Sequence, residues 1–162
     1  RRWHPGQAWI WEPGGFGVFD PGINALSIVT RIMPQPLFVS RSVLSYPANR
    51  EAPIAADLVF TSRGEGEDLR AVFDWRQTGP QSWDIDIETA SGKRLKLADG
   101  GSRLEIDGRV VAHEKPAEYE AIYERFATLL YEDRSEVDQK PFRLVADAFM
   151  VGKRIVVEPF ED

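Results

Sequence analysis

The chain has 162 residues, 43% of them hydrophobic and 28% charged, with a net charge of −6 at pH 7, and these values are typical of one globular domain. The acidic balance argues against nucleic-acid binding, the absence of cysteine excludes disulfides and thiolate chemistry, and two isolated histidines make a metal site unexpected. No apolar run approaches the roughly 18 residues that cross a membrane and no leader signal is recognisable, so we expect a cytoplasmic protein without membrane or nucleic-acid partners.

The first 17 residues are rich in aromatic side chains and glycine, and we predict a strand fragment followed by a long loop. Tryptophan rings can stack on the C–H faces of sugar rings, although core packing is the commoner role of any single tryptophan. The stretch begins Arg1-Arg2-Trp3-His4 without methionine, so the chain is expected to be part of a longer protein. The aromatic residues in this stretch are Trp3, Trp9, Trp11 and Phe16.

Residues 20–33 are predicted to form the first helix, because apolar residues recur at helical spacing and Pro34 ends the segment. Asp20 followed by Pro21 is a common helix start, in which the aspartate caps free backbone amides. Asp20 and Asn24 are four residues apart, so their polar groups lie on one helix face. Two interpretations stay open for each: Asp20 caps the helix or does proton or charge work, and Asn24 faces solvent or binds a ligand.

From residue 37 to about residue 111, apolar and polar residues alternate, as in antiparallel strands that bury one face. Trp83, Ile85 and Ile87, for example, alternate with acidic residues. We predict six or seven strands, mostly in meander order. Glycine-containing turn signals separate them: Gly64-Glu65-Gly66, Thr78-Gly79-Pro80, Ser91-Gly92, Asp99-Gly100-Gly101 and Asp107-Gly108.

Two helices and a short strand are predicted to close the chain. Pro116 opens the first helix, residues 138–152 form the second with Asp138 as its cap and Gly152 as its stop, and residues 154–157 form the strand. The resulting fold class is α+β: an open, mostly antiparallel sheet of about six to seven strands with helices packed on one face.

Three further side chains are candidates for a carbohydrate pocket. Trp3 and Trp83 rank as the more promising tryptophans, because Trp3 neighbours His4 and Trp83 follows a turn at a sheet end. His4 could bond a sugar hydroxyl or assist proton transfer, and it is equally explained as a surface histidine. The run Gly14–Gly17 lacks the spacing and the strand–helix context of a dinucleotide fingerprint, so no cofactor site is expected in this chain.

The glycine loop 14–17, followed by Asp20, Gly22 and Asn24, resembles a motif of the sugar dehydrogenases of the inositol dehydrogenase/glucose-fructose oxidoreductase family. That motif has a glycine-rich loop, then Asp, then Gly two residues on, and His or Asn at the fourth position. Within the family, the D-galactose and L-arabinose 1-dehydrogenases are most similar, with Asn at this position and a stretch like residues 9–15. Glu114-Lys115-Pro116 matches the family's catalytic Glu-Lys-Pro, but that tripeptide belongs upstream of the motif, so we interpret the match as coincidence.

The resemblance implies that residues 1–162 form the substrate-binding and dimerisation C-terminal domain of an enzyme whose N-terminal Rossmann domain and catalytic lysine lie outside this chain. The implied reaction oxidises an aldopyranose at C1 to a lactone by hydride transfer to NAD or NADP. Asp20 would be catalytic, whereas Asn24, Trp3, His4 and Trp83 would bind the sugar. Asn24 cannot act as acid or base, so proton removal would fall to the lysine, with Asp20 as its partner or as the alternative base.

On this resemblance, the isolated chain is expected to be inactive and to bind neither a dinucleotide nor a metal. It is also expected to form a homodimer through the open face of its sheet. Two alternatives stay open: a non-catalytic carbohydrate-binding relative, and a dehydrogenase for another polyol.

Overall fold

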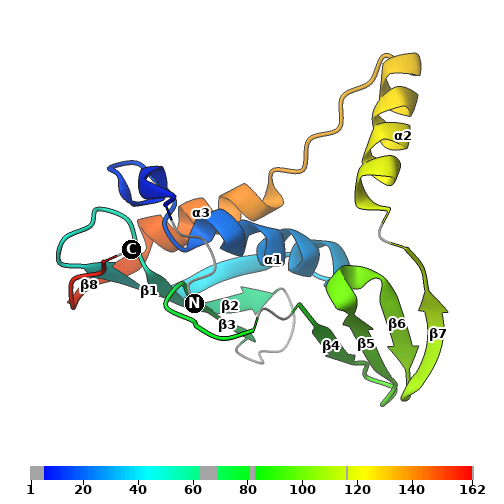
Figure 1. The fold of residues 1–162 in the computed structure, drawn as a ribbon, viewed down its shortest axis with the longest axis horizontal. Helices are drawn as coiled ribbons and strands as arrows, with labels where there is room; N and C mark the ends of the chain where they lie inside the picture. The colour runs from blue at the N-terminus through cyan, green and yellow to red at the C-terminus, as the bar shows by residue number, and fades with distance from the viewer. Residues whose placement is uncertain (1–5, 63–68, 81–82, 116, 162) are drawn as a thin grey trace. The chain divides into compact units, whose positions relative to one another are not determined.

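The computed structural model describes residues 6–62, 69–80, 83–115 and 117–161. They divide into two compact units, one formed by residues 1–79 and 138–162 and the other by residues 80–137. Each unit contains one four-stranded sheet (Figure 1). The predicted α+β class is confirmed. The single sheet of six or seven strands is wrong, because the eight strands among the described residues form two separate sheets.

The first unit is a sheet with two helices on one face (Figure 1). Strand order is β3-β2-β1-β8, and β8 runs parallel to β1 whereas the other neighbours are antiparallel. Helices α1 and α3 lie side by side over β1 and β2. The elements are 3-10 helix η1 (Ala8–Trp11), α1 (Phe19–Ile32), β1 (Leu37–Pro47), β2 (Ala55–Ser62), β3 (Leu69–Asp74), α3 (Lys140–Met150) and β8 (Gly152–Val157).

The main core lies between this sheet and the two helices. Helix α1 buries Phe19, Gly22 and Leu26, which recur at positions i, i+3 and i+7 on one face. A Cβ at Gly22 would lie 3.3 Å from the ring of Phe73 on β3. Glycine therefore allows the first turn of α1 to approach the sheet closely, which is a packing reason for this position of the motif.

A second, smaller core fixes the segment that precedes α1. The ring of Trp11 packs edge-on against Trp75 at a centroid distance of 5.1 Å and against Phe160 at 5.3 Å. Trp11 is only 3% exposed, so the core-packing interpretation is confirmed for this tryptophan. Residues from near both ends of the chain thus hold the loop that leads into α1.

The second unit is an antiparallel meander in the order β4-β5-β6-β7, as predicted for this stretch. Asp107 and Gly108 connect β6 and β7 with φ values of +50° and +77°, the left-handed pair that a two-residue hairpin turn requires. Of the predicted turns, Gly64-Glu65-Gly66 lies outside the described residues. The elements are β4 (Ile85–Glu88), β5 (Arg94–Ala98), 3-10 helix η2 (Asp99–Gly101), β6 (Arg103–Ile106), β7 (Arg109–His113) and α2 (Glu118–Tyr131).

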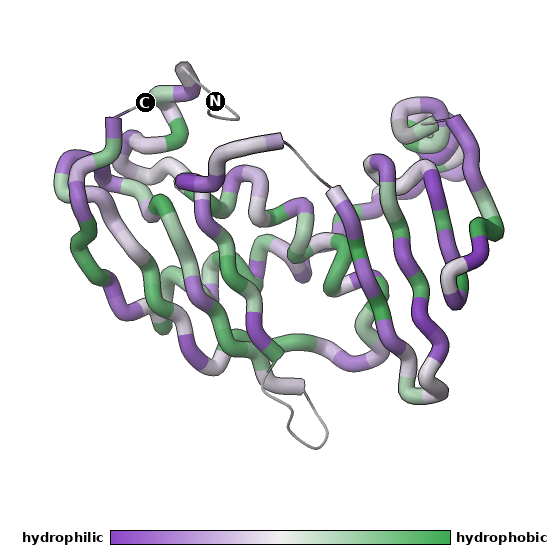
Figure 2. Tube along the Cα trace, turned by 60° about the horizontal axis from the view of Figure 1, so that its bottom comes forward, coloured by the Kyte–Doolittle hydropathy of each residue, from purple (hydrophilic) through white to green (hydrophobic). Residues whose placement is uncertain are grey.

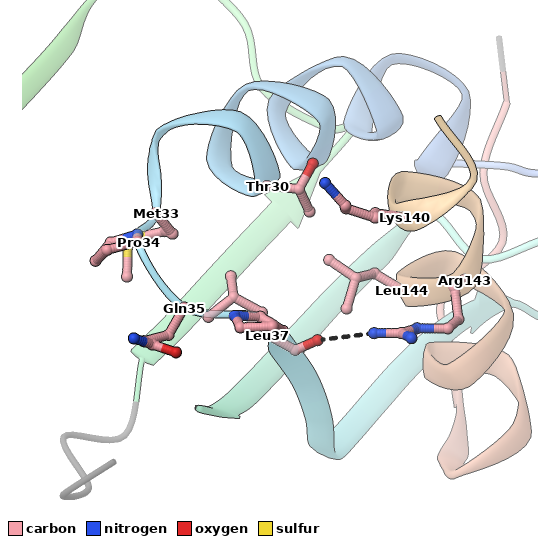
Figure 3. A pocket seen from close by; sticks show the side chains of 9 residues that line it. Thr30, Met33, Pro34, Gln35, Leu37, Lys140, Arg143 and Leu144 are labelled. Atoms are coloured by element: carbon pink, nitrogen blue, oxygen red, sulfur yellow. Dashed lines mark hydrogen bonds between the residues drawn. The ribbon is translucent and has the colours of Figure 1, made fainter. Parts of the chain in front are cut away.

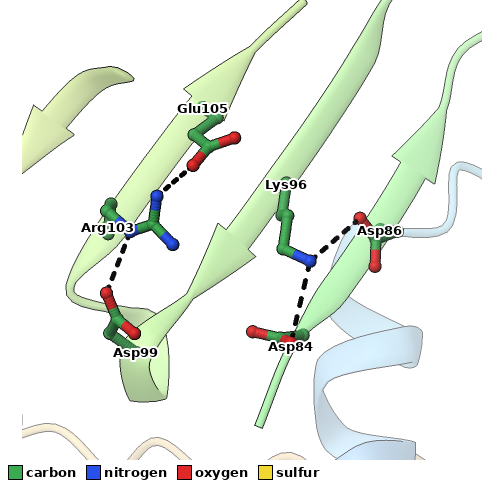
Figure 4. Close-up of polar contacts among 6 residues, drawn as sticks. All are labelled: Asp84, Asp86, Lys96, Asp99, Arg103 and Glu105. Atoms are coloured by element: carbon green, nitrogen blue, oxygen red, sulfur yellow. Dashed lines mark hydrogen bonds and ion pairs between the residues drawn. The ribbon is translucent and has the colours of Figure 1, made fainter. Parts of the chain in front are cut away.

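Hydrophilic and hydrophobic residues alternate along these strands (Figure 2), so one face of the second sheet is charged. Lys96 on β5 lies 3.7 Å from Asp84 and 3.8 Å from Asp86, and Arg103 on β6 contacts Asp99 and Glu105 (Figure 4). Such surface pairs add little stability each, but Asp86 and Lys96 lie directly opposite each other on β4 and β5, and this pairing favours the observed register.

Two predicted helix boundaries need correction. Asp138 does not begin α3: its carboxylate accepts the Lys140 amide at 3.0 Å in the turn before the helix. Gly152 does not stop α3 through a left-handed conformation, because it is the first residue of β8. Its Cβ would lie 2.5 Å from the Ala148 carbonyl oxygen, so close packing explains this glycine. Pro116, the expected start of α2, lies outside the described residues.

Among the described residues, no helix combines the length and the hydrophobicity needed to cross a membrane. Within the same ranges, no three histidine or acidic side chains are grouped so that they could hold a metal ion.

Candidate functional site

The glycine loop before α1 holds the start of that helix in place. Gly17 has a φ of +55°, and a Cβ there would lie 2.2 Å from the Pro53 carbonyl oxygen. A Cβ at Gly15 would similarly lie 2.4 Å from the Ile10 carbonyl oxygen. Both glycines are therefore required for close contact with the chain's own backbone.

The first amides of α1 are already hydrogen-bonded. A helix normally leaves its first four N–H groups without partners. In this helix, proline at position 21 has no N–H, and the neighbouring amides donate to backbone carbonyls. The bonds are Val18 to Pro53 (2.7 Å), Phe19 to Phe16 (3.1 Å), Asp20 to Gly17 (3.0 Å) and Gly22 to Val18 (3.2 Å).

This arrangement does not fit a dinucleotide. Pyrophosphate binding at a helix start needs free backbone amides and a glycine turn that follows a strand. The loop instead follows η1, its glycines contact protein backbone, and the amides at the start of α1 are occupied. We therefore derive no cofactor contact from the residues that the structure describes.

Asp20 lies in the first turn of α1 and is half-buried. The helix start has no side-chain cap hydrogen bond, and the carboxylate makes no hydrogen bond or ion pair within the described part of the chain. Backbone carbonyls accept the amide hydrogen bonds that a capping aspartate would otherwise accept. The capping interpretation is therefore wrong, and the carboxylate is available for another partner.

Asn24 follows one turn later on the same face of α1 and is exposed. Its backbone carbonyl accepts the Ser27 hydroxyl at 2.8 Å, while its side-chain amide has no partner among the described residues. At helical spacing, Ser27 and Arg31 continue this row along the face opposite Phe19, Gly22 and Leu26. The sequence analysis missed these two residues, although positions i+7 and i+11 from Asp20 are the signal that would have found them.

An open cavity of about 240 Å³ lies beside the first turns of α1. Asp74 lines it, and hydrogen bonds from the Arg76 side chain lower the pKa of that carboxyl. Complete ligand pockets usually enclose ~300–1,000 Å³, so this hollow has the size of part of a site. It is lined by Val18, Pro21, Gly22, Ala25, Val72, Phe73, Asp74, Trp75 and Gln77.

A second cavity, of about 150 Å³, lies at the other end of α1 (Figure 3). Thr30 and Gln35 contribute polar groups, and Lys140 and Arg143 contribute positive charge from α3. Arg143 donates a long hydrogen bond of 3.5 Å to the Leu37 carbonyl. Ten residues of helix separate Thr30 from Asp20, about 15 Å at 1.5 Å per residue, so this cavity is distinct from the Asp20 face.

The roles of the other predicted site residues stay predictions. Trp3 and His4 lie outside the described residues. Trp83 belongs to the second unit and is 42% exposed; a Cβ at Gly101 would meet its ring at 3.7 Å. Its role toward a ligand bound at α1 stays a prediction. Lys115, from the tripeptide judged coincidental, is exposed in the second unit.

No protein-family model matches the chain. A galactose 1-dehydrogenase from Pseudomonas fluorescens is 51% identical over 164 aligned positions, which include the whole of this chain and 52% of that protein. A D-galactose-1-dehydrogenase structure from Rhizobium etli superimposes with a TM-score of 0.86 at 56% identity, covering 98% of this chain and 50% of that one.

More distant structures show the fold alone. A 3-ketoreductase from Actinomadura kijaniata, in complex with TDP-benzene and NADP, is 12% identical with a TM-score of 0.66, covering 91% of this chain and 51% of that one. An oxidoreductase from Thermotoga maritima is 11% identical with a TM-score of 0.62, covering 93% of this chain and 47% of that one. The chain thus spans about half the length of the relatives that it matches.

Proposed function

We propose that the chain is the substrate-side domain of an NAD(P)-dependent aldose 1-dehydrogenase, within the sugar dehydrogenase family that includes these galactose 1-dehydrogenases. The full-length enzyme would oxidise an aldopyranose such as galactose or arabinose to its lactone. In that reaction the C1 hydrogen leaves as hydride to the nicotinamide, which becomes reduced, and the C1 hydroxyl releases a proton.

The free carboxylate of Asp20 is the observation that carries this proposal. A half-buried aspartate in the first turn of a helix, with no cap bond and no ion pair in the described chain, has only its attraction to the helix dipole, about 0.3–1 kcal/mol, as a structural role. An acidic group without a partner in the described chain is suited to proton transfer or to holding a catalytic base. Asp20 would accept the C1 hydroxyl proton or position the lysine that accepts it.

Asn24 would orient the sugar. Its amide both donates and accepts hydrogen bonds, which suits a hydroxyl group that does the same. Asn24 cannot accept a proton at neutral pH, so the two side chains would have different roles. Asp20 would take part in proton transfer, and Asn24 would hold the sugar ring in its orientation. Trp3, His4 and Trp83 remain proposed sugar contacts, from the resemblance of aromatic and polar surroundings to carbohydrate pockets.

The cofactor would be bound elsewhere in the full-length protein. The start of α1 has no free amides to offer a pyrophosphate, which supports binding of NAD or NADP by a separate nucleotide-binding domain. This chain by itself would then be inactive.

A homodimer through an open sheet face remains part of the proposal. Charged side chains that could face a second copy are paired within the chain: Lys96 with Asp84 and Asp86, Arg94 with Glu88, and Arg76 with Asp74. The stability of a dimer would therefore depend less on salt concentration than it would if these charges were paired only across the interface. Sedimentation of the full-length protein at low and high salt tests it: a dimer is expected at both, and a monomer at tens of micromolar contradicts it.

The full-length protein, assayed against a panel of aldoses with NAD and with NADP, tests the function. Reduction of either cofactor by D-galactose or L-arabinose is expected. These two sugars are the first to compare, because they differ only in the substituent at C5. Activity with a non-aldose polyol alone would favour the alternative dehydrogenase, and sugar binding without reduction of either cofactor would favour the non-catalytic relative.

A further inference from the structure

Helix α2 carries a continuous apolar stripe that is exposed along its whole length. The residues recur at positions i, i+3, i+4, i+7 and i+11 on one face of a 14-residue helix. Their side chains are 51–67% exposed, whereas α1 and α3 both bury their apolar faces. The stripe consists of Tyr119, Ile122, Tyr123, Phe126 and Leu130.

Such a helix needs a surface to pack against. Helices of this length are marginally stable in water, and most of their stability in proteins comes from packing one apolar face. Single exposed apolar residues are ordinary, but a contiguous row of five marks an interaction site. The Arg125–Glu136 ion pair beside the stripe is exposed on both sides, so solvent screens it and it does not replace that packing.

The length of the relatives indicates what covers the stripe. The Rhizobium etli structure matches 98% of this chain, so its fold includes a counterpart of α2, and the match takes up only 50% of that protein. A second copy of α2 is a poorer partner, because Glu120 and Glu124 outnumber Arg125 on this helix, and two acidic helices repel each other.

We propose that the stripe docks on an apolar surface patch of the nucleotide-binding domain of the full-length protein, so that α2 ties the substrate side to the cofactor side. The proposal rests on the proposed function, which supplies that domain. It assigns α2 an interdomain role, and no residue of α2 takes part in the chemistry.

Hydroxyl-radical footprinting of the full-length protein tests the docking without any mutation. Tyr119 and Tyr123 lie on the stripe, whereas Tyr131, the last residue of α2, points about 120° away from the centre of the stripe at 100° per residue and is 93% exposed. If nothing covered the stripe, their exposed fractions of 67% and 66% would make them nearly as reactive as Tyr131. Docking predicts that both are oxidised several-fold more slowly than Tyr131, at every protein concentration tested.

A pair of variants tests the same contact by hydrogen exchange of the α2 amides. Phe126→Ser should speed exchange at least tenfold, because it removes the centre of the stripe. Tyr131→Ser, a similarly large aromatic-to-serine change outside the stripe, should leave exchange unchanged. If Phe126→Ser does not fold, the footprinting of the wild-type protein decides alone.

Three outcomes overturn the proposal: equal oxidation of the three tyrosines, protection that vanishes on dilution, and unchanged exchange in a folded Phe126→Ser protein. Dilution-sensitive protection assigns the stripe to a second copy instead. The aldose assay separates this test from the proposed function. Aldose oxidation with an unprotected stripe overturns the docking alone, and a protected stripe without aldose oxidation overturns the function alone.

Discussion

Asp20→Asn in the full-length protein separates chemistry from folding. The substitution removes the negative charge and keeps the size of the side chain. The start of α1 is held by backbone hydrogen bonds to the carbonyls of Pro53, Phe16 and Gly17. The structural cost is therefore limited to the lost attraction between a carboxylate and the helix dipole, about 0.3–1 kcal/mol, or a fall in Tm of roughly 1–4 °C.

The effect on turnover should be far larger. Loss of a general acid–base group lowers rates by about 10²–10⁴-fold, which equals roughly 2.7–5.4 kcal/mol in the activation free energy. We expect a decrease of that size in kcat at saturating aldose and cofactor, with the protein still folded by circular dichroism. Near-wild-type kcat in folded Asp20→Asn would refute the catalytic assignment.

Asp138→Asn is the matched control. Asp138 lies two residues before the first residue of α3, and its carboxylate accepts the Lys140 amide, a hydrogen-bonding role that Asp20 does not have within the described chain. The asparagine oxygen can accept the same bond. This variant should keep wild-type kcat, and a similar loss of turnover in both variants would point to general disturbance of the fold.

Three further predictions concern the surroundings of the site. Gly22→Ala should destabilise the protein by up to about 2 kcal/mol in urea unfolding, because overpacking of its Cβ against the Phe73 ring at 3.3 Å, about 1–3 kcal/mol, outweighs the roughly 1 kcal/mol that alanine gains over glycine in a helix; a gain in stability would show that the ring moves aside freely. The lowered pKa of Asp74 contributes stability that is present above the ordinary carboxyl pKa and is lost as pH falls through the lower folded value. Arg76→Met should therefore lose less stability than wild type between pH 7 and pH 3, and equal losses would contradict this. Calorimetry of this chain with NAD and NADP should show no heat of binding, and micromolar affinity for either would contradict the account of the α1 start.

Local patterns predicted the individual elements well, for a physical reason. In β3, the alternation of the partly buried Leu69, Ala71 and Phe73 with the exposed Arg70, Val72 and Asp74 shows which face of that strand packs on the core. It says nothing about which strands become neighbours. The parallel pairing of Val43 with Lys153 joins opposite ends of the chain, and only the folded chain shows that β8 takes this edge.

The candidate site was predictable in part. The spacing of Asp20 and Asn24 fixes their common face, because helix geometry is local. Whether Asp20 caps the helix or does chemistry could not be decided from the neighbouring residues. The answer depends on a residue distant in sequence, Pro53, whose carbonyl accepts the Val18 amide. The role of Trp11 likewise depends on Phe160, near the opposite end of the chain. The sequence left a sugar-stacking role and a core-packing role open for such tryptophans. The contact with Phe160 shows that Trp11 has the core-packing role.

Transfer of deuterium from D-galactose labelled at C1 tests the central claim most directly. The full-length protein is incubated with the labelled sugar and with NAD or NADP, and the reduced cofactor and the sugar product are analysed by mass spectrometry. The account predicts one deuterium in the reduced nicotinamide and formation of the corresponding lactone, both strongly reduced in Asp20→Asn. A cofactor that stays oxidised with galactose and with every other aldose tested would contradict the account.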